Sequence, residues 1–246
     1  MKTFGLIGFP LGHSFSQQYF TEKFIREGIT NCCFKIFPIA SIDLFPTILK
    51  DNPSLCGLCV TIPYKEQVLA YVDIQSDEVN AIGATNSIHF YKNKLVAYNT
   101  DIIGFEQSFC KLLQPHHKKA LVLGTGGASK AVQYVLKKLG IGFLIATRSE
   151  ISSPVQINYN QIDASIITEY TIVINCSPVG MVPNENELPF LPYEYIGKSH
   201  YFFDLVYKPA NTLFLQQGEK KGATIKNGFE MLVLQAEESW RIWNEG

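Results

Sequence analysis

The chain has 246 residues, a formal net charge of -1 at pH 7 and a hydrophobic content of 46%. This composition is typical of a globular protein with a well-filled core, and the length accommodates one large domain or two small ones. The sequence has no run of Lys or Arg, no apolar stretch of membrane-spanning length and no signal-peptide pattern in MKTFGLIGFP. We therefore expect a soluble, cytoplasmic protein that binds neither nucleic acid nor membranes.

The six cysteines fall mostly in apolar, strand-like runs. Cys56 and Cys59 have the spacing of a metal-binding or redox pair, but they lie inside an alternating strand pattern with no second such pair. His116 and His117 lie in the polar segment QPHHKK without an acidic or cysteine partner nearby in sequence, which indicates turn residues. We therefore expect reduced thiols and no bound metal.

The first hundred residues alternate between strand and helix patterns. Strands are predicted at 4–8, 31–39, 55–62, 87–91 and 95–98, and helices at 17–27, 41–50, 65–71 and 77–81. Ser16 is the predicted N-cap of the first helix. The turn 92–94 between the last two strands indicates a hairpin. This half is predicted to be a small α/β domain.

The second half has the same alternation. Strands are predicted at 120–123, 142–149, 171–175, 201–205 and 223–226, and helices at 101–113, from 128 onward, at 211–221 and over the last residues, NGFEMLVLQAEESWRIW. Residues 149–170 are predicted to be an irregular polar segment with one weak helix. Strands that alternate with helices favour a parallel sheet.

The segment ALVLGTGGASKA, residues 120–131, combines an apolar strand, a glycine-rich turn and the start of an amphipathic helix. This order makes a phosphate site, because the helix N-terminus presents free N–H groups and the glycines let a pyrophosphate approach them. Ser129 occupies the position of the third small residue of the usual fingerprint. The segment predicts a dinucleotide site.

The next strand ends in Thr147, Arg148 and Ser149. An NAD-binding unit usually has Asp or Glu there, whereas a guanidinium matches the geometry and charge of a 2′-phosphate. Glu150 lies beyond the strand end. The pattern favours NADP(H) as cofactor and leaves NAD(H) as the alternative.

Polar residues of the first half fall where predicted strands end, and ligands of open α/β sheets bind beyond the carboxyl ends of the strands. Reduction of a ketone by hydride also needs a group that donates a proton to the developing alkoxide or stabilises its charge. Lys65 is the candidate for this role, with Asp101 as the residue that orients it. The full set of polar candidates is Ser14, Ser16, Thr61, Lys65, Asn86 and Asp101.

Eight segments of the chain, taken in order, resemble the shikimate dehydrogenase family. They are GFPLGHSFS at 8–16, VTIPYKE at 60–66, GATNS at 83–87, NTD-x-x-G at 99–104, VLGTGGASKA at 122–131, INCSPVGM at 174–181, DLVYKP at 204–209 and NGFEMLVLQA at 227–236. Eight motifs in the same order are far more specific than any single one.

The resemblance implies a two-domain α/β enzyme. Residues 1–100, completed by the C-terminal helix 229–246, are expected to form a substrate-binding and catalytic domain with a mostly parallel sheet. Residues 101–228 are expected to form a Rossmann-like NADP-binding domain. The implied reaction is the reversible, NADPH-dependent reduction of 3-dehydroshikimate to shikimate, a step of chorismate and aromatic amino acid biosynthesis. The implied oligomeric state is a monomer or a homodimer.

The resemblance also implies roles for individual residues. Ser14 and Ser16 would hold the substrate carboxylate, and Lys65 and Asp101 would form the catalytic pair. Thr61, Asn86 and Gln235 would bind the ring hydroxyls or the carboxylate side, with Tyr207 near them. The residues expected to contact the cofactor are Gly124, Gly126, Gly127 and Ala128 at the pyrophosphate, Thr147, Arg148 and Ser149 at the 2′-phosphate, and Gly228 and Met231 at the nicotinamide.

The chain departs from the family pattern in three places. The strand end reads T-R-S where the family often has N-R-T, and Cys176 and Ser177 stand where two threonines are common. Residues 150–170 form a short segment in which a second phosphate-binding arginine cannot be placed. Two alternatives remain: a quinate/shikimate dehydrogenase that prefers NAD, which Arg148 argues against, and a non-catalytic NADP(H)- or metabolite-binding regulator, which would be expected to have lost Lys65 or Asp101.

Overall fold

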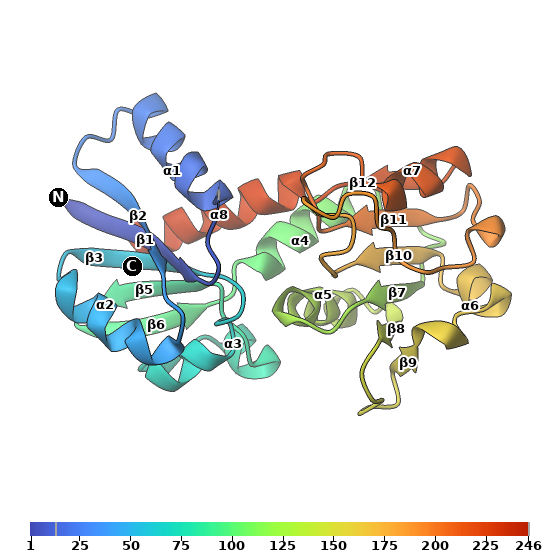
Figure 1. Cartoon of the computed structure of the whole chain (residues 1–246), viewed down its shortest axis with the longest axis horizontal. Helices are drawn as coiled ribbons and strands as arrows, with labels where there is room; N and C mark the ends of the chain where they lie inside the picture. Colours follow the sequence, from blue (N-terminus) through green and yellow to red (C-terminus); the bar gives the residue numbers. More distant parts are fainter. Residues whose placement is uncertain (13, 246) are drawn as a thin grey trace. The chain divides into compact units, whose positions relative to one another are not determined.

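The computed structural model describes residues 1–12 and 14–245, and the chain divides into two compact units (Figure 1). Unit 1 comprises Met1–Thr100 and Ala236–Gly246, and unit 2 comprises Asp101–Gln235. The division falls inside the last helix, α8 (Phe229–Glu245), whereas the sequence analysis assigned the whole of that helix to the first domain. The difference arises because the first turns of α8 pack on a helix of unit 2.

Unit 1 is built on a six-stranded mixed sheet. In sheet order its strands are β2 (Cys32–Pro38), β1 (Lys2–Gly8), β3 (Leu55–Val60), β5 (Ser87–Tyr91), β6 (Lys94–Tyr98) and β4 (Ile74–Gln75). The first three strands are parallel to one another, β5 is antiparallel to both of its neighbours, and β4 is parallel to β6. The predicted hairpin is confirmed: Lys92 and Asn93 both have positive φ, as a two-residue turn between twisted strands requires. The two-residue strand β4 was not predicted.

Helices cover both faces of this sheet. They are α1 (Phe15–Arg26), α2 (Phe45–Asp51), α3 (Asp77–Ile82), the end of α8, and the 3₁₀ helices Ile42–Leu44 and Gln67–Tyr71. One face packs against α1 and α8 through a cluster that includes Phe4, Phe20 and Trp243. The opposite face packs against α2 and the second 3₁₀ helix through Ile7, Leu58 and other apolar residues.

Two local predictions for unit 1 were wrong. The N-cap of α1 is Ser14, whose side chain accepts a hydrogen bond from the Gln17 backbone N–H, and Ser16 lies inside the helix. The helix predicted at 65–71 is a 3₁₀ helix that begins two residues later, at Gln67. The Lys65 carbonyl accepts a hydrogen bond from the Thr85 N–H, at 2.8 Å, and is therefore engaged outside the helix.

Unit 2 is built on a six-stranded parallel sheet. Its strands, in sheet order, are β12 (Thr224–Lys226), β11 (Tyr201–Asp204), β10 (Ile172–Asn175), β7 (Lys119–Leu123), β8 (Gly142–Thr147) and β9 (Gln156–Asn158). This order is that of a doubly wound dinucleotide-binding fold, and it reverses direction between β7 and β10. The predicted α/β fold class with a Rossmann-like unit is confirmed. The edge strand β9 lies in the segment expected to be irregular, because three residues are too few to show a strand pattern.

Helices cover both faces of the second sheet as well (Figure 1). They are α4 (Asp101–Cys110), α5 (Gly127–Lys138), α6 (Ala164–Glu169), α7 (Leu213–Lys220), the start of α8, and the 3₁₀ helices Tyr159–Gln161 and Tyr193–Tyr195. Phe202 on β11 stacks on Phe214 of α7, with ring centroids 4.6 Å apart. On the other face, Phe105 and Phe109 of α4 pack against Phe203. No helix in the described part of the chain is long and apolar enough to cross a membrane.

Candidate active site

Ser14 and Ser16 lie at the N-terminal end of α1. The Ser14 Oγ accepts a hydrogen bond from the Gln17 N–H at 3.4 Å, which leaves its hydroxyl proton available to a ligand. The start of a helix favours a carboxylate, because unpaired N–H groups and the positive end of the helix dipole point toward it. Residue 13 of the same motif lies outside the described residues.

Backbone hydrogen bonds bring Thr61, Lys65 and Asn86 to one edge of the sheet in unit 1. The Thr61 N–H donates to the Ile7 carbonyl at 3.0 Å, and the Val60 N–H donates to the Asn86 carbonyl at 2.8 Å. The Lys65 carbonyl is tied to Thr85, next to Asn86, by the 2.8 Å bond described above. The structure therefore places these three predicted residues close together at the carboxyl ends of β1 and β3.

Thr100 fixes the side chain of Asn86, although it was not among the predicted site residues. The Asn86 Oδ1 accepts a hydrogen bond from the Thr100 N–H at 2.6 Å, and the Asn86 Nδ2 donates to the Thr100 Oγ1 at 2.9 Å. The Thr100 hydroxyl also lies 3.0 Å from the Ser239 Oγ on α8. Asn86, buried with 4% exposure, is thereby held in one orientation. Thr100 lies in the motif NTD at 99–101, which was a signal that it matters. Its partner Asn86 lies 14 residues away in sequence, so the contact between them could not be inferred from the motif.

In unit 2, Asp101 is the first residue of α4 and is buried. One turn later, Gly104 lies so close to α8 that a Cβ atom there would be 2.5 Å from the Met231 carbonyl oxygen and 3.1 Å from the Gln235 Cβ. Only glycine allows this approach of two helices. It places Gln235 and Met231 within one helical turn of Asp101, and it explains why the first part of α8 belongs to unit 2.

The glycine-rich segment forms the expected turn between β7 and α5. Gly124 leaves the strand with a φ of 107°, and Gly126 is the N-cap of α5 in an extended conformation. A Cβ atom on Gly126 would point into open space, which leaves room for a ligand in front of the helix N-terminus. Gly127 and Ala128 begin the helix, and their N–H groups lack partners within it. These residues fit a pyrophosphate.

Ser129 is fully buried behind this loop. Its Oγ accepts a hydrogen bond from the Gln133 Nε2 at 3.1 Å, and it also bonds the thiol of Cys176 at the end of β10. Burial raises the pKa of the Cys176 thiol, which the bond from Ser129 offsets only in part. Ser129 therefore fits at the third position of the usual fingerprint, where a small residue is needed because helix and strand pack closely.

The end of β8 presents one cation. The Thr147 Oγ1 accepts a hydrogen bond from the Ser149 N–H at 3.0 Å, which shapes the turn, and Arg148 and Ser149 are exposed. Tyr159 is near enough for the Arg148 charge to lower its pKa, although burial raises that pKa by more. Residues 149–197 contain neither Lys nor Arg. Arg148 is thus the basic side chain that this segment offers to a 2′-phosphate.

The ends of β10 and β11 carry a buried polar network that the sequence analysis did not identify. Asn175 and Asp204 are register partners, and the Asn175 Nδ2 donates to the Asp204 Oδ1 at 3.0 Å. Asp204 also accepts hydrogen bonds from the Val206 N–H at 3.0 Å and the Thr212 hydroxyl at 2.6 Å. Asn175 and Asp204 are each the last residue of a buried strand and lie within recognised motifs. This position in the sequence was the signal that could have identified them.

The predicted residues of the last two motifs belong to unit 2 as well. Tyr207 is half-buried, and burial raises its pKa. The Gly228 N–H donates to the Val206 carbonyl at 3.2 Å. Met231 and Gln235 are buried on α8, and the Gln235 Nε2 donates to the Leu232 carbonyl at 2.8 Å. Within unit 2 the structure therefore groups Tyr207 with Gly228, and Asp101 with Met231 and Gln235.

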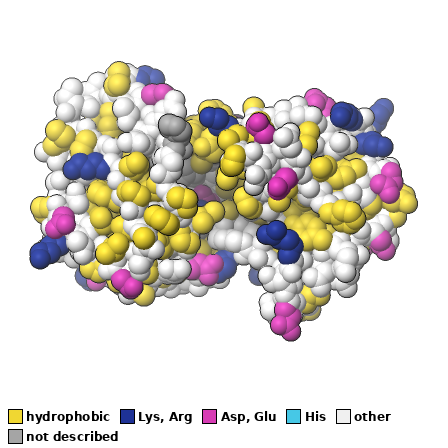
Figure 2. All heavy atoms as spheres, in the orientation of Figure 1, with side chains coloured by type: hydrophobic (Ala, Val, Ile, Leu, Met, Phe, Trp, Pro, Cys, Tyr) yellow, Lys and Arg dark blue, Asp and Glu magenta, His cyan; other side chains and the backbone are white. Residues whose placement is uncertain are grey.

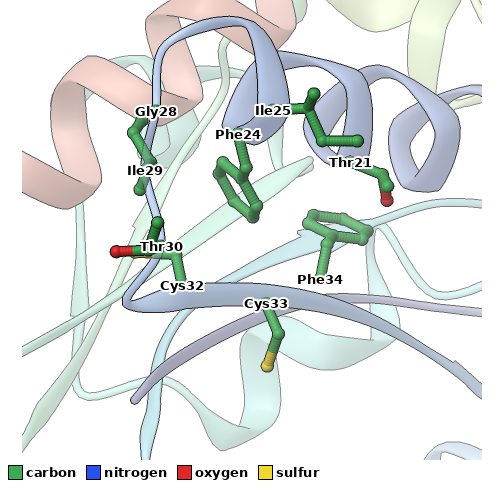
Figure 3. A pocket seen from close by; sticks show the side chains of 9 residues that line it. All are labelled: Thr21, Phe24, Ile25, Gly28, Ile29, Thr30, Cys32, Cys33 and Phe34. Carbon is green, nitrogen blue, oxygen red and sulfur yellow. The ribbon is translucent and has the colours of Figure 1, made fainter.

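Of two hollows on the surface of unit 1, one is lined in part by Ser14, and the other contains none of the predicted site residues. A hollow of about 410 Å³ lies between α1 and β2 (Figure 3), and its lining is mostly apolar, with Phe24, Ile25 and Phe34 among it. Charged side chains of both signs are scattered over the face drawn in Figure 2, without a basic stripe. Among the described residues, no three His, Cys, Asp or Glu side chains are arranged to hold a metal ion.

Comparison with known proteins identifies relatives over nearly the full length of the chain. Residues 6–88 match the family model described as the shikimate dehydrogenase substrate binding domain. The shikimate dehydrogenase (NADP(+)) of Caldicellulosiruptor saccharolyticus is 35% identical over an aligned length of 257 residues, and the alignment covers 99% of this chain and 92% of that protein. The corresponding protein of Aquifex aeolicus is 32% identical, over 99% of this chain and 91% of its own length.

Solved structures agree. The crystal structure of shikimate dehydrogenase from Aquifex aeolicus matches with a TM-score of 0.87 and 30% identity, over 100% of this chain and 93% of that one. A shikimate 5-dehydrogenase from Thermus thermophilus, solved in complex with NADP(H) and shikimate, matches with a TM-score of 0.83 and 26% identity, over 100% and 94% of the two chains.

Proposed function

Since this chain belongs to the shikimate dehydrogenase family, we propose a role for each of its site residues in that family's reaction. The chain is an NADP-dependent oxidoreductase that reversibly reduces 3-dehydroshikimate to shikimate, a step in the biosynthesis of chorismate and aromatic amino acids. Its substrates are small molecules. We also place the enzyme in the cytoplasm, in keeping with its six cysteine thiols. Its oligomeric state is either a monomer or a homodimer.

The substrate is bound by hydroxyl and amide groups. Ser14 and Ser16 hold the carboxylate at the start of α1, where the helix dipole assists them. Thr61 and Asn86 bind the ring hydroxyls, and Asn86 is suited to this because Thr100 holds its carboxamide in one orientation. Gln235 and Tyr207 complete the set. Unit 1 is therefore the substrate-binding domain.

Lys65 and Asp101 form the catalytic pair. Negative charge develops on the carbonyl oxygen during reduction, and the Lys65 ammonium stabilises it or donates the proton. Asp101, the first residue of α4, orients the ammonium. The non-catalytic alternative predicts the loss of one of these two residues, and both are present.

Unit 2 binds the cofactor. NADP(H) supplies or accepts the hydride when bound, and Gly124, Gly126, Gly127 and Ala128 receive its pyrophosphate at the start of α5. Thr147, Arg148 and Ser149 meet the 2′-phosphate, and Gly228 and Met231 approach the nicotinamide. Arg148, exposed at the end of β8, favours NADP(H) over NAD(H).

The observation that carries these assignments is the grouping of Thr61, Lys65 and Asn86 at the carboxyl ends of β1 and β3. The experiment that tests them mixes the purified protein with shikimate and NADP⁺ and follows the absorbance of the reduced nicotinamide. We expect turnover with NADP⁺ that falls sharply when Asn86 is replaced by Ala. Turnover with quinate and NAD⁺ in preference to shikimate and NADP⁺ would contradict the assignment.

A further inference from the structure

Asp204 is a fully buried carboxylate for which the described residues provide three hydrogen-bond donors and no ion pair. A buried anion without a cation is unfavourable for folding, even when it is hydrogen-bonded. Burial accordingly raises the pKa of Asp204 to about 6, against the opposing effect of its three hydrogen bonds. Stability alone therefore gives no reason for an acid at the end of β11.

The first branch of the Asp204 network orders the loop after β10. The Asn175 Nδ2 donates both to the Asp204 Oδ1 and to the Val179 carbonyl, at 3.0 and 3.2 Å. The Asn175 Oδ1 consequently faces Ser177 and accepts hydrogen bonds from its N–H and its hydroxyl, at 3.1 and 2.6 Å. The orientation of one carboxamide, set by Asp204, thus fixes the loop that begins at Cys176.

The second branch orders the backbone after β11. The Asp204 Oδ1 accepts the Val206 N–H, and the Val206 carbonyl accepts the Gly228 N–H at 3.2 Å. Gly228 has no room to shift, because a Cβ atom there would lie 2.2 Å from the Leu205 carbonyl oxygen. The carboxylate therefore determines how the chain leaves β11 at Val206 and where it enters α8 at Gly228.

We propose that Asp204 is a positioning residue for the nicotinamide side of the cofactor site, whose charged carboxylate holds Val206 and, through it, Gly228 in place without touching substrate or cofactor. The inference rests on the proposed function in one respect, the assignment of Gly228 to that side. The three hydrogen bonds and the close packing at Gly228 support it independently of the reaction.

The charge can be separated from the shape. An Asn at position 204 would keep the volume, but its single neutral oxygen would serve both Val206 and Asn175, and hydrogen bonds to a charged acceptor are roughly twice as strong. Asp204→Asn would also remove the cost of burying a charge. The substitution should therefore loosen the loop without lowering the stability of the protein.

Thr212→Val is the matched control. The Thr212 hydroxyl donates to the Asp204 Oδ2, and its oxygen caps α7 by accepting the Leu215 N–H at 3.3 Å. Valine removes both bonds but leaves the two Oδ1 bonds to Val206 and Asn175. Loss of a cap and of a buried hydrogen bond lowers stability, so this variant should be less stable while the loop keeps its position.

The measurements are made at pH 8, where the pKa of about 6 leaves Asp204 ionised. The titratable groups that the Asp204 charge affects are Cys176, after β10, and Tyr193, in the 3₁₀ helix Tyr193–Tyr195. The pKa values of both are raised, so both stay neutral at this pH. Charge at this site therefore changes only through the substitution.

Three readouts are compared for each variant: amide hydrogen exchange at Val206 and Gly228 in the cofactor-free protein, the thermal midpoint, and kcat and KM for each substrate. For Asp204→Asn we expect about tenfold faster exchange at both amides and about a tenfold loss of kcat/KM for NADP⁺. We expect an unchanged KM for shikimate and a thermal midpoint equal to or above that of the wild type. Thr212→Val should show the reverse pattern, with a lower midpoint and wild-type exchange and kinetics.

Wild-type exchange and kinetics in Asp204→Asn would overturn the proposal, and so would parallel losses of stability and activity in both variants. A wild-type protein inactive on shikimate would refute the proposed function instead. In that case NADPH titration followed by nicotinamide fluorescence would still decide the positioning role, since a role confined to packing predicts equal affinity for the wild type and Asp204→Asn.

Discussion

The raised pKa of Asp204 predicts a stability that depends on pH in a direction unusual for an acid. Its pKa rises from an ordinary 3.8 in the unfolded chain to about 6 in the folded protein. Between these values the folded state binds more protons than the unfolded state, so the free energy of unfolding decreases as pH rises. A difference of about two pKa units corresponds to a contribution of about 3 kcal/mol to the free energy of unfolding. This contribution is present in full below pH 3.8 and is lost above about pH 6.

The substitution Asp204→Asn isolates this contribution. Wild-type stability alone would not, because burial lowers the pKa values of His89 and His117, and those groups favour folding as pH rises through the same range. The difference in unfolding free energy between the variant and the wild type should therefore increase by about 3 kcal/mol from pH 4 to pH 7. It should stay constant above that range.

Scanning calorimetry on both proteins at several pH values measures the difference. Tryptophan fluorescence is unsuitable, because Trp240 and Trp243 are the two tryptophans of the chain and both belong to unit 1. For a protein of this size, 3 kcal/mol corresponds to roughly 6–12 °C in the midpoint of unfolding. A difference that is the same at pH 4 and pH 7 would show that the carboxylate is not destabilised by burial, and the reasoning would fail.

Four further outcomes are expected. Lys65→Ala should lower kcat at least ~100-fold with little change in KM. The loss of kcat in the double variant Lys65→Ala with Asp101→Asn should be smaller than the product of the losses in the two single variants. Near-normal kcat in Lys65→Ala would exclude its catalytic role. Arg148→Ala should cost about 1.5–3 kcal/mol in NADP⁺ affinity and leave NAD⁺ unaffected, as measured by titration with each cofactor; equal losses would argue against the 2′-phosphate contact. Ser14→Ala should raise the KM for shikimate more than it lowers kcat, and steady-state kinetics with the opposite split would indicate a role in catalysis. Gly228→Ala should destabilise the protein by about 1–3 kcal/mol in denaturant unfolding, since its Cβ meets backbone that cannot move away, and a stable variant would show that the contact yields.

Most of the fold could be predicted because buried strands and amphipathic helices follow from residues close together in sequence. The N-cap of α1 was within reach as well: Ser14 precedes Gln17 by three residues, which is the spacing of a capping box. Ser16 also precedes apolar residues at helical spacing, which is why Ser16 was predicted as the N-cap instead of Ser14. The edge strand β9 was beyond prediction, because it exists only through its pairing with β8.

The site divides in the same way. Residues in recognisable motifs, such as Lys65 and Arg148, could be named from the sequence. Their supporting contacts could not, because Thr100 acts on Asn86 and Asp204 acts on Asn175 across 14 and 29 residues of chain. The first pair closes across a hairpin and the second joins neighbouring parallel strands, so each depends on how two strand ends align in the folded chain.

The division of the chain inside α8 has a consequence for biosynthesis. Residues 101–235 are contiguous, so every residue of unit 2 has been translated before the last residues of unit 1. Unit 1 cannot complete its core, because Trp243 and Ala236 pack with Phe4 of the sheet and Phe20 of α1, and they are translated after all of unit 2. The usual N-terminal-first order of folding is thereby reversed. During synthesis, an apolar sheet face remains uncovered for as long as the ribosome takes to translate a whole second domain, and this nascent surface is the part of the molecule most in need of chaperones.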